Sequence, residues 1–167
     1  MSVDRVREYL KEFGLEGKVK EFEVSSATVE LAAKAAGVIP ARIAKTLSFK
    51  VGDGAVLVVA AGDAKIDNRK YKDQFGTKAK MLTPEEVVEY TGHAIGGVCP
   101  FDIRDERVTA YLDISMKRFD TMFPAAGSDS SCVVLTLEEL ERASHSAGWI
   151  DVCKLPDAEQ SAGGERN

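Results

Sequence analysis

One lysine stands out because its place in a predicted strand is unusual for a charged side chain. In strand register, Lys45 of the run IAKTLSFK shares a face with the apolar residues Leu47 and Phe49. Its ammonium group must therefore either extend past the strand to reach water or project into a cleft. The pattern leaves both outcomes open. In a cleft, the charge could hold a phosphate, a carboxylate or a polarised carbonyl.

A second stretch, TGHAIGGVCPFD, combines backbone freedom with rigidity. Gly96 and Gly97 can adopt backbone angles that other residues avoid, and they leave their amide groups uncovered. Pro100 fixes its own φ angle and disfavours helix at Cys99. Such a loop suits close approach by a ligand, and it equally suits a plain tight turn.

A nucleophilic pair of Cys99 and His93 is the main rival source of chemistry. The two residues lie six positions apart, but the sequence offers no third group that would orient the imidazole. Cysteine is more often a small buried hydrophobic residue, so we expect Cys99 not to act as a nucleophile. His145 is predicted near a helix C-terminus, where a cation is favourable, which fits a structural role.

The composition bounds the class of protein. The chain has 167 residues, of which 44% are hydrophobic, enough for one domain with a substantial core. Cys99, Cys132 and Cys153 form no CxxC pair, which argues against a disulfide framework and against a zinc site. The charged start lacks the apolar run of a signal peptide, and no stretch approaches the roughly 20 apolar residues of a membrane span. We therefore expect a cytoplasmic domain with no membrane contact.

Charge is distributed unevenly along the chain. The net charge of −5 argues against a surface covered with basic side chains. Between Lys65 and Lys80, however, six basic residues face only two acidic ones, which gives this segment a local charge of +4. Such a patch could meet a phosphate backbone, or it could be an ordinary solvated helix face.

The elements that must position these residues alternate between helix and strand. Hydrophobic spacing, capping residues and glycine stops predict helices at 3–13, 28–36, 67–75, 83–91 and 136–145, and strands at 18–24, 45–51, 55–62, 78–82, 108–114, 132–135 and 149–154. The GDG between the second and third strands indicates a hairpin. We expect an α+β domain with a mixed sheet over residues 1–154, followed by a disordered tail over residues 155–167.

Four segments, taken in order and spacing, resemble the YbaK/ProX family of freestanding aminoacyl-tRNA deacylases. They are SSATVELAAKAAGVIPARIAKTLSFKV, VLVVAAGDAKID, TGHAIGGVCPFD and AYLDIS. The resemblance extends from about Val19 to Val152, and the family is related to the editing domain of bacterial prolyl-tRNA synthetase. It implies a mixed, strongly curved, barrel-like sheet flanked by helices.

The resemblance also implies a site for hydrolysing the ester of a mischarged aminoacyl-tRNA without a protein nucleophile, metal or cofactor. The family's central lysine falls on Lys45, which is the expected catalytic residue, and the family's G-x-x-x-P loop falls on Gly96 to Pro100. Loop amides would orient the aminoacyl group or polarise its carbonyl, while water or a substrate group attacks. The expected substrate-binding residues are Thr46, Gly96, Gly97, Val98, Cys99, Pro100, Asp113 and Ser115.

The resemblance implies aminoacyl-tRNA and prolyl-tRNA synthetase as partners, and the basic segment predicts tRNA contacts at Arg69, Lys70 and Lys72. Thr46 departs from the asparagine of the alanine-specific branch, and Ser128-Asp129 replaces a basic pair in a glycine-flanked turn. The expected substrate is Cys- or Ala-tRNA(Pro)-like, with serine and threonine also open. The alternative is a catalytically idle module of the same fold that binds tRNA or a synthetase.

Overall fold

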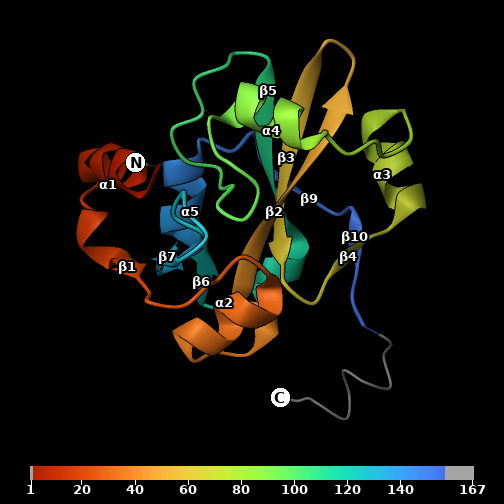
Figure 1. The fold of residues 1–167 in the computed structure, drawn as a ribbon. Coiled ribbons are helices and arrows are strands. Elements are labelled where there is room, and N and C mark those ends of the chain that lie inside the picture. Colours follow the sequence, from red (N-terminus) through yellow and green to blue (C-terminus); the bar gives the residue numbers. More distant parts are fainter. Residues whose placement is uncertain (1, 157–167) are drawn as a thin grey trace.

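A strongly curled, six-stranded mixed sheet forms a half-barrel at the centre of the fold (Figure 1). The computed structural model describes residues 2–156. The strands follow the order β8 (Leu135–Thr136), β6 (Thr121–Pro124), β2 (Ile43–Val51), β3 (Gly54–Ala61), β5 (Val108–Asp113) and β9 (Trp149–Ile150). This arrangement confirms the predicted α+β class and the curved sheet.

The predicted hairpin is the centre of that sheet. Strands β2 and β3 pair antiparallel, with Lys45 opposite Ala60, while β6 and β5 pair parallel to their outer edges. Every residue of β3 from Ala55 to Ala61 is buried, as expected of an apolar central strand. Two small antiparallel pairs flank the sheet, β1 (Val19–Glu21) with β7 (Ser131–Val133) and β4 (Lys65–Ile66) with β10 (Cys153–Lys154).

Five α-helices lie within the described residues, and each of the last four begins directly after its predicted capping residue. They are α1 (Ser2–Leu10), α2 (Val29–Ala36), α3 (Asn68–Phe75), α4 (Pro84–Thr91) and α5 (Leu137–Ser144). The helix predicted at 3–13 is α-helical only to Leu10 and continues as a 3₁₀ helix over Lys11–Phe13. Thr28 and Asp67 accept hydrogen bonds from the first turns of α2 and α3, and Thr83 and Thr136 form complete capping boxes. None of these helices is long and apolar enough to cross a membrane.

Four strand predictions need correction. The strand predicted at 132–135 divides into β7, which pairs with β1, and β8, which pairs with β6. The segment 78–82 is not a strand: only Met81 forms a bridge, to Phe49, because the segment meets the open edge of β2 through scattered hydrogen bonds. The strand predicted at 18–24 is ordered as strand only over β1. The strand predicted at 149–154 divides into β9 and β10, since Val152 between them donates its amide to Asp113 instead of to a strand. Residues 157–167 of the predicted tail lie outside the described residues.

Candidate functional site

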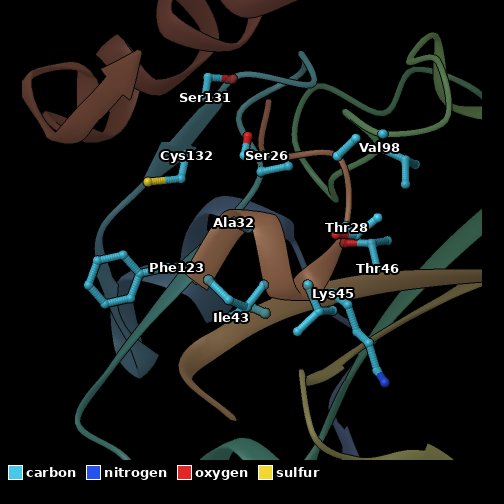
Figure 2. A pocket seen from close by; sticks show the side chains of 15 residues that line it. Ser26, Thr28, Ala32, Ile43, Lys45, Thr46, Val98, Phe123, Ser131 and Cys132 are labelled. Carbon is cyan, nitrogen blue, oxygen red and sulfur yellow. The ribbon is translucent and has the colours of Figure 1, made fainter. Parts of the chain in front are cut away.

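A pocket of about 140 Å³ opens between β2, the start of α2, strands β6 and β7, and the loop after α4 (Figure 2). Its apolar wall comes from Val29, Ala32, Ile43 and Phe123. Hydroxyl groups supply its polar part, from Ser26, Thr28, Thr46 and Ser131, and Lys45 also borders it. Three sequence-predicted site residues besides Lys45 line it, namely Thr46, Gly96 and Val98.

Lys45 lies half-buried at the edge of the pocket, with its ammonium directed away from Ile43 and Phe123 (Figure 2). The Nζ atom donates hydrogen bonds to the carbonyl oxygens of Gly62, at 3.3 Å, and Ala64. Burial lowers the pKa of Lys45. An ammonium has three N–H donors, so one donor has no partner among residues 2–156. Lys45 thus borders the pocket, while two backbone carbonyl groups accept hydrogen bonds from its ammonium group.

Two buried hydroxyl groups in the pocket have no hydrogen-bond partner within the described chain. Thr46 is 9% exposed and Ser26 is 7% exposed, and neither Thr46 Oγ1 nor Ser26 Oγ is paired there. A buried polar group without a partner costs free energy, so native proteins rarely retain one without a reason. In a pocket, the simplest reason is a ligand that supplies the missing partner.

The glycine loop contributes Gly96 and Val98 to the pocket but not Gly97. Gly96 has a φ of +98°, a conformation that suits glycine. The expectation that the Gly97 amide faces a substrate is wrong, because it donates to the carbonyl oxygen of Ala94 at 3.0 Å. A Cβ at Gly97 would lie only 2.6 Å from the backbone nitrogen of Ser128, so this glycine permits close packing of two loops.

Cys99 and His93 do meet, but in the core. Their Sγ and Nε2 atoms are 3.6 Å apart, and both residues are fully buried. Nε2 also lies 2.9 Å from the carbonyl oxygen of Phe101, which can only accept, so Nε2 carries the proton and cannot take one from the thiol. Burial raises the pKa of Cys99 to about 12. The expected place of Cys99 in the pocket is therefore wrong, and a nucleophilic role is unsupported.

Pro100 faces a different hollow from the one that Lys45 borders. It lies with Tyr9 and His145 beside β5, and it does not line the pocket of Lys45. The expectation that Pro100 lines the substrate pocket is therefore wrong. The chain enters the core at Cys99, so only Gly96 and Val98 of the loop line the pocket.

Asp113 and Ser115 do not line the pocket either. The Asp113 carboxylate accepts hydrogen bonds from the amides of Ser115 and Val152, both at 2.9 Å. The Ser115 hydroxyl accepts from the amide of Ala61 at 3.1 Å. Both residues are buried, and these bonds tie the ends of β3 and β5 to the segment before β10. Their expected place in the pocket wall is wrong because backbone amides already occupy them.

The basic residues of α3 divide into two groups. Lys70 is committed, with Nζ 3.1 Å from Asp151 Oδ1 and 3.0 Å from the carbonyl oxygen of Cys153. Arg69 and Lys72 are exposed and border a separate hollow of about 560 Å³ together with Lys78. The structure thus brings together two of the three predicted cations and adds Lys78.

Several pocket residues were not expected from the sequence. Ser131 and Cys132 come from β7, and Phe123 comes from β6, which enters the sheet beside Ile43. Burial raises the pKa of Cys132 to about 11, so its thiol is protonated near neutral pH. Other pocket residues belong to a segment that carried the family resemblance, although none was named as a site residue: Ser26, Ala27, Thr28, Val29, Ala32, Ile43 and Ala44.

Comparisons with known proteins agree with this geometry. Residues 23–143 match the model of the aminoacyl-tRNA editing domain, and the chain belongs to this family. The protein is similar to YwhH of Bacillus subtilis (strain 168), an uncharacterized protein, with 56% identity over 155 residues that cover 92% of this chain and 98% of YwhH.

Two further relatives carry informative names. Proline–tRNA ligase of Thermosipho melanesiensis is 36% identical over 94 residues, which cover 55% of this chain but only 17% of the ligase. The crystal structure of a candidate trans-editing enzyme for prolyl tRNA synthetase superposes with a TM-score of 0.82 and 32% identity, covering 92% of this chain and 97% of that one. These similarities confirm the family resemblance and the fold expected from it.

Proposed function

We propose that this protein hydrolyses the ester bond of a mischarged aminoacyl-tRNA, acting in trans as a freestanding editing domain. The observation that carries the proposal is the pocket in which the hydroxyl groups of Thr46 and Ser26 have no partner among residues 2–156, with one unpartnered N–H of Lys45 at its edge. Membership of the editing-domain family supports the reaction class. The near-complete overlap with a candidate trans-editing enzyme supports action as a separate protein.

The chemistry follows from what the pocket offers. Water adds to the ester carbonyl carbon, and the bond to the ribose oxygen then breaks with a proton passing to that oxygen. Where a group of the substrate adds first, water must afterwards hydrolyse the acyl product of that step. The third N–H of Lys45 would hold the substrate near the ester. The amides of Gly96 and Val98, which have no hydrogen-bond partner within residues 2–156, would stabilise the negative charge that develops on the carbonyl oxygen. Products are the free amino acid and the tRNA.

The substrate is a small amino acid on a tRNA(Pro)-like acceptor: cysteine, alanine, serine or threonine. The pocket volume of about 140 Å³ and the walls of Ile43 and Phe123 favour a small aminoacyl group. The unpartnered hydroxyl groups of Ser26 and Thr46 would bond to polar atoms of that group. The hydroxyl groups of Thr46 and Ser26 can each donate or accept a hydrogen bond, so these two residues alone do not determine which of the four amino acids is bound.

The tRNA backbone would dock on the hollow bordered by Arg69, Lys72 and Lys78. Removing one lysine that neutralises a phosphate should reduce the slope of log binding constant against log salt by about 0.7 to 0.9. We therefore expect Lys72→Ala to weaken tRNA binding and flatten its salt dependence. Lys70→Ala is the matched control, because it removes the same charge from the same helix but from a side chain already held by Asp151. Equal slopes for both variants would contradict docking at this hollow.

The direct test is release of the amino acid from a panel of preformed aminoacyl-tRNAs. Purified protein is mixed with tRNA(Pro) carrying cysteine, alanine, serine, threonine or the correct proline, and free amino acid is measured over time. We expect release from one or more mischarged species and none from the prolyl species. Tight tRNA binding without release from any species would contradict the enzyme and favour the idle module instead.

A further inference from the structure

The N-terminal helix α1 lies outside residues 23–143, which match the editing-domain family, yet one of its side chains reaches the pocket loop. The Arg5 guanidinium donates from Nη1 to the carbonyl oxygen of Gly92 at 2.9 Å and from Nη2 to that of Thr91 at 3.4 Å. It also pairs with Asp102 through Nε and Oδ2, at 2.5 Å, and donates to the Asp102 carbonyl oxygen.

These hydrogen bonds fall on the two ends of one loop. Thr91 and Gly92 end helix α4, Asp102 follows residues 93–101, and Gly96 and Val98 within that span line the pocket. A single guanidinium therefore joins the residues that flank the loop on its two sides. Its planar set of donors suits this task, since it can meet several acceptors in fixed directions at once.

The contact between Arg5 and the residues that flank the loop is closely packed and largely shielded from solvent. The side chains of Arg5 and Asp102 are 24% and 14% exposed. Although burial raises the pKa of Asp102, hydrogen bonds from Arg104 and Arg5 hold that pKa below its usual value, so the carboxylate is charged. A Cβ at Gly92 would overlap the Arg5 guanidinium, so the close approach needs glycine there. Asp102 itself has a φ of +57°, an uncommon angle for a non-glycine residue.

The rest of the loop is held at two more points. His93 and Phe101 join its two sides through a 2.9 Å hydrogen bond, and Gly97 packs on the backbone of Ser128. Between these points the segment that reaches the pocket has little freedom. If the ends moved apart, the amides of Gly96 and Val98 would move relative to the pocket.

We propose that Arg5 is a positioning residue: it clamps both ends of the loop 93–101 and thereby sets the place of Gly96 and Val98 in the pocket. The proposal rests on the proposed function, because the loop's place matters to catalysis only if the pocket hydrolyses an ester. A misplacement of a catalytic group by about 1 Å can reduce the rate by about 100-fold.

The kinetic test compares variants of two arginines on the same helix. We expect Arg5→Ala to lower kcat/KM for the mischarged tRNA that the wild type cleaves by about 10-fold to 100-fold, and Arg5→Lys to restore part of that loss. Arg7→Ala is the control, since among residues 2–156 Arg7 pairs only with the exposed carboxylates of Asp4 and Glu21. Arg5→Met, which removes every N–H donor of the side chain but keeps an unbranched apolar stem, provides a second variant if Arg5→Ala does not fold. Wild-type kcat/KM in folded Arg5→Ala, or in Arg5→Met where Arg5→Ala does not fold, would overturn the proposal.

Hydrogen–deuterium exchange separates this proposal from the proposed function, because it needs no substrate. We expect the amides of residues 93–101 to exchange faster in Arg5→Ala than in the wild type, with the central strands β2 and β3 unchanged. Exchange that is unchanged in the loop, or that rises equally throughout the chain, would overturn the clamp. If the loop loosens but the wild type cleaves no mischarged tRNA, the proposed function fails and the clamp stands as a structural device.

Discussion

Two pairs of buried polar side chains lie near the same end of the central sheet and behave in opposite ways. Asp113 and Ser115 direct their oxygen atoms to backbone amides, and each of these oxygen acceptors has a partner at about 3 Å. Ser26 and Thr46 are buried to a similar extent, but their hydroxyl groups have no partner among residues 2–156.

The difference separates side chains that hold the fold from those that await a ligand. A buried polar group that is paired stabilises the folded state, whereas an unpaired one destabilises it until something binds. Residue type does not distinguish the two pairs, since a serine belongs to each. What distinguishes the pairs is whether a backbone amide lies within hydrogen-bond distance of the side chain. Most of these amides come from distant parts of the chain.

The largest change in the free energy of unfolding is expected for a substitution of Asp113, and it tests this contrast. Asp113→Ala would leave the buried amides of Ser115 and Val152 without acceptors. At roughly 1 to 3 kcal/mol for each group left unsatisfied, we expect the free energy of unfolding to fall by about 3 kcal/mol. Urea denaturation measures this, and kcat/KM per folded molecule should remain as in the wild type. Normal stability together with abolished turnover would place Asp113 in the active site after all.

The opposite pattern is expected at Thr46. Thr46→Val keeps the shape of the side chain but removes the unpartnered hydroxyl, so the free energy of unfolding should be unchanged or slightly higher. Loss of one hydrogen bond to the substrate should lower kcat/KM by about 10-fold. Thr46→Ser, which keeps the hydroxyl, is the control. A Thr46→Val protein that is less stable but fully active would contradict the claim that Thr46 serves the substrate and not the fold.

Features of the fold that depend on residues close together in the sequence were predicted correctly. The helix caps at Thr28, Asp67, Thr83 and Thr136 and the hairpin at GDG are local signals, and all are present. Lys45 was identified because strand periodicity is local too. The place of Asp113 at the end of β5 was equally visible, but its hydrogen bond to Val152 spans 39 residues and no local pattern encodes it.

The same limit explains the errors at the loop. Gly96 and Gly97 look alike in sequence, yet only Gly96 lines the pocket, because Gly97 packs on Ser128 from a distant turn. Phe123 and Cys132 had no signal at all, since the register of β6 and β7 decides which of their side chains face inward.

The smallest effect on activity is expected at Cys99. Cys99→Ala should leave kcat/KM unchanged, because the thiol is buried away from the pocket and its pKa of about 12 keeps it protonated. The free energy of unfolding should fall by about 1 kcal/mol, as for an ordinary core truncation. Trapping of an aminoacyl group on the Cys99 sulfur would contradict this prediction and restore the nucleophilic pair with His93.

The most direct measurement of the central claim is single-turnover release of the amino acid by Lys45→Ala. Lys50→Ala is the matched control, because Lys50 lies on the same strand with the same charge but bonds to Tyr90 outside the pocket. With both variants folded, we predict that Lys45→Ala loses about 100-fold or more of the wild-type rate, the scale of losing one electrostatic stabiliser, and that Lys50→Ala does not. A folded Lys45→Ala protein that releases the amino acid at the wild-type rate would contradict the account.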